Sequence, residues 1–169
     1  MLKWFHKMQK EAEDMEKCRI HVSAPNLLCI CVDKADEGKI VGRMYDRYSK
    51  EPFVFGELSQ LINRMESLFD RIGYPQASTM GRRFSEDKTM LVQNKEGVVQ
   101  VLKTEDIMRQ SGDKATFVVH VQYRQNATWQ GNVMWAENQQ SASFRSALEL
   151  LKLIDSALDV REKEGDKVC

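Results

Sequence analysis

Apolar residues recur along the chain with two periods, one typical of helices and one typical of strands. Helical spacing appears in three stretches, at residues 1–18, 55–73 and 144–159. Runs rich in β-branched and aromatic residues lie between them and predict strands at residues 27–32, 40–48, 116–123 and 128–135. The first helix is amphipathic, with one apolar face made by Trp4, Met8, Ala12 and Met15.

Residues 73–115 follow neither period closely. Two short β-rich runs, at residues 90–92 and 98–102, flank a turn-forming stretch and predict a hairpin. Residues 104–108 predict a short helical turn. The last ten residues, 160–169, form a charged tail that is predicted to be disordered.

The order strand, strand, helix occurs twice, and the two copies align without a gap at an offset of 89 residues. Gly42 falls on Gly131 and Phe55 on Phe144, and the apolar positions of both copies stay in phase. One such unit is too small to bury a core alone, so two units are expected to share one sheet. The alternative is that any two amphipathic units of this order align once their helices are in phase.

This pattern predicts an α+β fold, a two-layer sandwich whose antiparallel sheet is built from two tandem ββα units about a pseudo-twofold axis. The units are residues 27–72 and 116–159, and both long helices are expected on one face of the sheet. Residues 73–115 form an insertion with the β-hairpin, so that one domain spans residues 19–159. The N-terminal helix, residues 1–18, packs on this domain or on a partner.

The charge balance limits the classes of partner. The chain has 25 basic and 25 acidic side chains, and only residues 71–115 lean basic, by two charges. Such a chain has no bulk electrostatic attraction for nucleic acid or for an anionic membrane. No run of about 18 apolar residues and no secretory signal appear, and the four cysteines suit free thiols. We therefore expect a cytoplasmic protein without membrane contact.

Four side chains near the first strand form a candidate metal site: Cys18, His21, Cys29 and Cys31. The spacing of the first two suits a zinc ligand pair, but the last two lie close together on one strand. At the offset of 89, Cys29 and Cys31 align with Val118 and His120, which favours a second interpretation, as small buried apolar residues. No metal and no cofactor are expected.

The most distinctive stretch is the turn between the last two predicted strands. It gathers an arginine, amides and aromatic rings in six candidate binding residues, Tyr123, Arg124, Gln125, Asn126, Trp129 and Gln130. Arg82 and Arg83 form a second candidate, for an anion or an acidic partner. A polar hairpin beside the core, a protein interface, and a nucleic-acid or small-ligand site all remain possible interpretations of the turn.

The sequence shows no recognisable arrangement of a nucleophile, a base and an orienting group, and carboxylate pairs that could act in catalysis cannot be located from sequence. It has three histidines, on three separate segments, and no glycine-rich phosphate loop. We expect a non-enzymatic binding or adaptor protein that acts through protein–protein contacts, with a partner protein or a second copy. The alternatives are single-stranded nucleic-acid binding through residues 123–131 with Arg82 and Arg83, and a small-ligand sensor with a pocket between the two units.

Overall fold

The computed structural model describes residues 20–36, 38–78 and 98–165, and side chains up to residue 161. The elements are β1 (Leu28–Asp36), β2 (Lys39–Tyr45), β3 (Phe53–Phe55), α2 (Leu58–Ile72), α3 (Thr104–Met108), β4 (Ala115–Tyr123), β5 (Gln130–Trp135), β6 (Gln140–Phe144) and α4 (Ala147–Gly165). Several predicted features lie outside the described residues: the N-terminal helix, Cys18, Arg82 and Arg83, the strand at residues 90–92 and the end of the tail.

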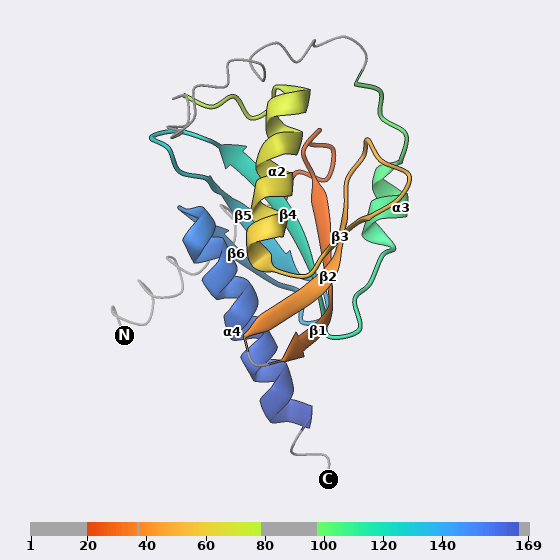
Figure 1. Ribbon diagram of the computed structural model, residues 1–169, viewed down its shortest axis with the longest axis vertical. Helices are drawn as coiled ribbons and strands as arrows, with labels where there is room; N and C mark the ends of the chain where they lie inside the picture. The colour runs from red at the N-terminus through yellow and green to blue at the C-terminus, as the bar shows by residue number, and fades with distance from the viewer. Residues whose placement is uncertain (1–19, 37, 79–97, 166–169) are drawn as a thin grey trace, which may run out of the picture.

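The six strands form one sheet in the order β3-β2-β1-β4-β5-β6, and neighbouring strands are antiparallel (Figure 1). This confirms the predicted α+β class, an antiparallel sheet with helices packed on it. The sequence predicts four of these strands. β3 and β6 are absent from the prediction because one is only three residues long and the other begins in a polar stretch that predicts a loop.

The structure corrects the prediction at two helix starts and one strand. Phe55 and Phe144 end β3 and β6 rather than beginning the helices, which start three residues later at Leu58 and Ala147. Residues 98–102, predicted as a strand, form none. Instead, the backbone amides of residues 101 and 102 both donate to the carbonyl oxygen of Arg47. These two bonds hold the segment beside the sheet, although it does not pair with a strand.

The two halves of the sheet, residues 28–72 and 115–161, share their strand registers at a constant offset of 89. The facing pairs that recur at this offset include Val32–Gly42 with Val121–Gly131, and Gly42–Phe55 with Gly131–Phe144. Register shifts also recur, after Val32 in β1 and after Val121 in β4. The strand order is therefore the same from the middle of the sheet to either edge.

Gly42 and Gly131 occupy the same crowded position in the two halves. A Cβ at Gly42 would collide with the carbonyl oxygen of Cys31 and lie 2.9 Å from the ring of Phe55. A Cβ at Gly131 would collide with a carbonyl oxygen of β4 and lie 2.9 Å from the ring of Phe144. Each glycine lets two backbones and a phenylalanine ring meet where any side chain would separate them.

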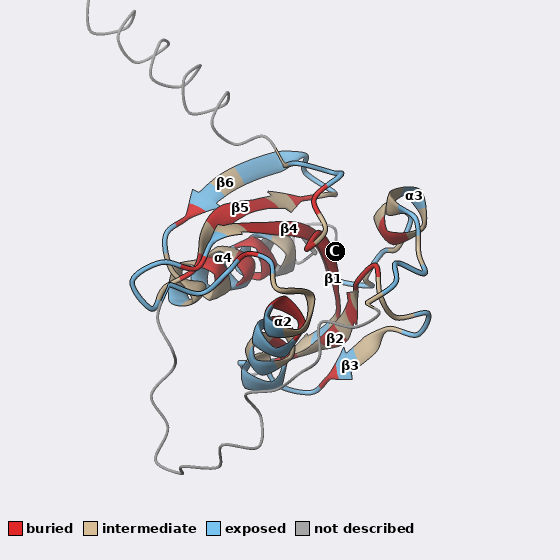
Figure 2. Ribbon diagram, turned by 90° about the horizontal axis from the view of Figure 1, so that it is seen from above, coloured by how far each residue is buried: buried red, intermediate tan, exposed pale blue. Residues whose placement is uncertain are grey.

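The main core lies between the concave face of the sheet and the helices α2 and α4 (Figure 2). Successive strand residues point to opposite faces, so Leu28 and Ile30 of β1 and Phe117 and Val119 of β4 all face these helices. The helices pack against the sheet with apolar stripes, which are Leu61, Met65, Leu68 and Phe69 in α2 and Leu150, Ile154, Ala157 and Leu158 in α4. α2 ends, as predicted, at Gly73.

α3 lies on the other face of the sheet, where Ile107 packs against Cys29 and Cys31 (Figure 2). An ion pair on this face links β1 to β2, because the guanidinium of Arg43 donates two hydrogen bonds of 2.8 Å to Asp33. The hydrogen bonds from Arg43 hold the pKa of the Asp33 carboxyl below its usual value. β1 is thus covered on both faces.

Candidate functional site

The β4–β5 turn holds six candidate binding residues, and the structure divides them. Arg124 and Trp129 are buried, with 6% and 7% exposure, and Gln130 is half-buried in β5. Tyr123, Gln125 and Asn126 are exposed. The turn therefore presents two amides and one aromatic ring to solvent, and its guanidinium and indole belong to the interior.

Arg124 ties the turn to the C-terminal end of α2. Its guanidinium lies 2.7 Å from the carboxylate of Asp70 and 3.6 Å from that of Glu66. The same group lies 5.7 Å from the ring centre of Phe69 and donates a 3.4 Å hydrogen bond to the carbonyl oxygen of Pro75. These contacts use the guanidinium within the chain, so its evident role is structural.

The candidate metal ligands that the structure describes do not form a cluster. Cys29 and Cys31 are fully buried with their sulfur atoms 3.8 Å apart, and the ring of His21 packs against that of His120, with 5.7 Å between centroids. The hydrogen bond with Cys31, together with burial, raises the pKa of the Cys29 thiol, which makes it a poor metal ligand. Within residues 20–36, 38–78 and 98–165, no three His, Cys, Asp or Glu side chains come close enough to hold a metal ion.

His120 is buried in β4, and neither of its ring nitrogens has a hydrogen-bond partner in the described part of the chain. Burial, together with the neighbouring His21, lowers the pKa of His120. The neutral imidazole is therefore favoured, which suits a ring packed inside the protein better than one that exchanges protons with a substrate.

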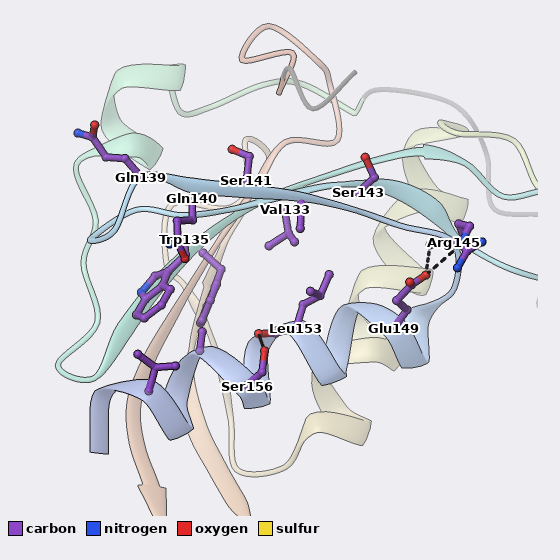
Figure 3. Close-up of a pocket in the computed structure, with 14 residues that line it drawn as sticks. Val133, Trp135, Gln139, Gln140, Ser141, Ser143, Arg145, Glu149, Leu153 and Ser156 are labelled. Atoms are coloured by element: carbon purple, nitrogen blue, oxygen red, sulfur yellow. Dashed lines mark hydrogen bonds and ion pairs between the residues drawn. The ribbon is translucent and has the colours of Figure 1, made fainter. Parts of the chain in front are cut away.

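A groove of about 1000 Å³ opens between β6 and α4. Apolar side chains line it from both sides, Phe117, Val133 and Trp135 from the sheet and Leu153, Ala157 and Val160 from the helix. Polar side chains lie at its two ends, Gln139 and Gln140 at one and the ion pair of Arg145 with Glu149 at the other (Figure 3). Seven of the fourteen lining residues are apolar and seven are polar or charged, so the groove offers both apolar surface and hydrogen-bonding groups to a bound molecule.

The groove lies where three side chains of the second half are smaller than their counterparts in the first. Three replacements at the offset of 89 open it, from Phe53 to Ala142, from Arg64 to Leu153 and from Leu68 to Ala157. In the first half, Phe53 packs on the core and the guanidinium of Arg64 lies 5.5 Å from its ring centre. Arg64 also lies 3.8 Å from the carboxylate of Asp46. The equivalent space beside β3 is therefore occupied, whereas the space beside β6 is open.

Trp135 lines one end of the groove. Its ring packs against Phe117 with 6.5 Å between centroids, and its indole N–H has no acceptor among the residues that the structure describes. A buried donor without a partner is unfavourable by about 1–3 kcal/mol. A bound group that accepted a hydrogen bond here would remove this penalty.

β6 runs along the groove and is an edge strand of the sheet. Its five residues, Gln140–Phe144, include no charged residue and no proline. The opposite edge strand, β3, has only three residues and follows Lys50, Glu51 and Pro52. Charges, proline and short length are the usual means of keeping an edge from pairing with another chain. β3 is short and directly follows such residues, whereas β6 is longer and is followed by one charged residue, Arg145.

The sequence did not predict the groove. A ligand pocket was expected between the two units, whereas this groove lies within the second half. Its signal was present in three aligned pairs, in which Ala142, Leu153 and Ala157 are smaller than the residues they align with. That signal has meaning only when the replaced side chains are known to be neighbours in space.

Comparisons with protein-family models, with curated proteins and with solved structures find no match for this chain. None of the helices in the described residues is long and apolar enough to cross a membrane.

Proposed function

We propose that this protein is a non-enzymatic binding protein that holds an extended segment of a partner protein along β6. The observation that carries the proposal is the position of an edge strand without charged residues or proline directly beside an open, partly apolar groove. A segment added to β6 would gain main-chain hydrogen bonds, and the groove would select its side chains.

The expected energetics suit a reversible interaction. Each bulky apolar side chain that leaves water for the groove would contribute about 1.5–3 kcal/mol. Two or three such side chains give about 3–9 kcal/mol, and ordering a flexible segment opposes this gain by several kcal/mol, so they correspond to weak binding, in or near the millimolar range. This supports an adaptor that exchanges partners.

A variant that fills the groove tests the proposal. A142F/L153R places in the second half the pair that already packs together in the first, where Phe53 and Arg64 lie in contact. We expect a displayed library of random peptides to yield sequences that bind the wild-type protein and bind A142F/L153R at least about tenfold more weakly. A library that yields no binder, or only binders that ignore the variant, would reject this function.

We also propose that the two halves arose by tandem duplication of a βββα unit, rather than the ββα unit expected from the sequence. The shared offset of 89 in strand registers supports this. The pairing of the central strands β1 and β4 also supports it. Cys29 faces Val118, and these two residues lie 89 positions apart, as a pseudo-twofold axis that passes between them requires. We propose with it the two-layer sandwich expected from the sequence.

We also propose a cytoplasmic location, which suits the two free thiols Cys29 and Cys31.

A small apolar molecule is the second candidate for the groove, because a volume of about 1000 Å³ lies at the upper end for small-molecule sites. Thermal unfolding in the presence of a metabolite library would detect it. A compound that raises the melting temperature of the wild-type protein, but not that of A142F/L153R, would identify such a ligand.

A further inference from the structure

We infer that the segment bound along β6 belongs to another protein and carries bulky apolar side chains at alternate positions. This inference rests on the proposed function and adds to it the chemistry of the partner. It follows from three observations, which are the alternation of β6, the size of the side chains missing from the groove, and the residues that a second copy would offer.

The alternation of β6 decides which side chains of a bound segment reach the groove. Ala142 and Phe144 pack toward the core and α4, whereas Ser141 and Ser143 point away from α4 (Figure 3). A strand that pairs with β6 shares this alternation, since side chains on adjacent strands point to the same face in register. Residues facing Gln140 and Ala142, two positions apart, therefore point to the groove side.

The first half indicates the size and polarity of those side chains. The ring of Phe53 lies where β6 carries only the methyl group of Ala142, and a leucine replaces the arginine that lies over that ring. The missing volume is thus that of an aromatic ring on an apolar surface. The Arg145–Glu149 ion pair, with 3.6 Å between its atoms, closes one end without net charge. An uncharged segment with phenylalanine or a branched aliphatic residue at every second position fits this space.

A second copy of the chain fits it less well. If β6 paired with β6 of another copy, the side chains offered on the groove side would be Gln140 and Ala142, which leave the groove unfilled. Phe144 is 1% exposed and packs in its own core, so it cannot reach across. The uncharged edge permits self-pairing, but the groove favours a different chain.

Two synthetic peptides of identical composition test this inference. Fluorescein-labelled KTFTFTFTK places all its phenylalanines on one face of a strand, and KTTFFFTTK does not. Fluorescence anisotropy should show the first peptide binding the wild-type protein about tenfold more tightly than the second. It should bind A142F/L153R about tenfold more weakly. V54S, a change on the exposed edge strand β3, should bind as the wild type does.

A second variant protects this test against misfolding of the first. Ser156 is exposed and lines the groove from α4, so S156K blocks the groove without altering the core, and it should also weaken binding. Equal affinity for the two peptides would overturn the inference. So would a wild-type dimer in light scattering that A142F/L153R converts to a monomer, because the occupant would then be a second copy. If both peptides fail while the random library yields other groove-dependent binders, only the inference falls, and the proposed function stands.

Discussion

Replacing Gly131 with alanine tests a close backbone approach in the sheet. The added Cβ would collide with a carbonyl oxygen of β4, and it would lie 2.9 Å from the ring of Phe144 and from the Cα of Val121. The carbonyl belongs to a paired strand and cannot move without loosening the ladder between β4 and β5. Gly42 has the same surroundings in the first half, so the same replacement there should have the same effect.

The size of the effect follows from two opposing terms. An alanine in place of glycine restricts the unfolded chain and stabilises by about 0.4–1 kcal/mol where the native backbone tolerates it. Overpacking usually costs about 1–3 kcal/mol, and the upper end applies here because the obstacle is backbone. We therefore expect each of G131A and G42A to lower the free energy of unfolding by about 2 kcal/mol. With a urea m-value of about 1–3 kcal/mol/M, the unfolding midpoint should fall by about 1 M.

Urea unfolding followed by circular dichroism measures these values, and G56A serves as the control. The atom nearest to a Cβ at Gly56 lies 3.8 Å away, so this variant should be as stable as the wild type or slightly more stable. Wild-type stability of G131A would refute the close approach. A difference of more than about 1 kcal/mol between G42A and G131A, well beyond ordinary scatter, would refute the equivalence of the two halves.

Three further predictions concern buried groups. R124M should lower the free energy of unfolding by about 1–2 kcal/mol, through lost packing and hydrogen bonds. Its ion pair adds little because Asp70 is half-exposed, and an unchanged urea midpoint would contradict a structural role. Because burial and His21 lower the pKa of His120, the unfolded chain binds a proton more readily than the folded protein. The free energy of unfolding should therefore fall as the pH drops below 6.5, the unperturbed value, by at most about 1.4 kcal/mol per pH unit until the folded pKa is reached. Urea unfolding between about pH 5 and pH 7 should show that the free energy of unfolding depends less on pH in H120C than in the wild type. An equal pH dependence in the two proteins would mean that His120 is not the group responsible. Cys29, buried and with a raised pKa, should react with iodoacetamide far more slowly in the native protein than in urea, as measured by mass spectrometry of its peptide.

The sequence predicted the parts of the fold in which local pattern and burial agree. β1 and β4 are β-rich runs buried on both faces, and α2 ends at Gly73. It failed where a strand is paired on one side only. β3 is only three residues long and β6 has three polar residues out of five, and the phenylalanines that end them continue the helical spacing of α2 and α4. The helices were therefore predicted to begin three residues too early.

The roles of the turn residues could not be read from local sequence. Arg124 looks like an interface residue because an arginine between a tyrosine and two amides is typical of a binding loop. Its actual partners, Asp70 and Glu66, come from the far end of α2. Nothing in the spacing of these residues indicates that the β4–β5 turn meets that helix end. Long-range ion pairs of this kind depend on the topology, which the local pattern does not contain.

The two halves have the same strand registers but carry side chains of different size beside their edge strands β3 and β6. This difference can be tested by measuring stability. If packing alone had shaped the second half, Ala142 and Leu153 would be poor choices, since larger side chains fit the equivalent space beside β3. A142F/L153R should then be more stable than the wild type, by about 1 kcal/mol, because cavity filling commonly gives about 0.5–2 kcal/mol. Higher stability together with lost peptide binding is the combination expected of a site kept open for a partner. Lower stability would mean that the second half cannot accommodate the side chains of the first, and the comparison between the halves would no longer explain the groove.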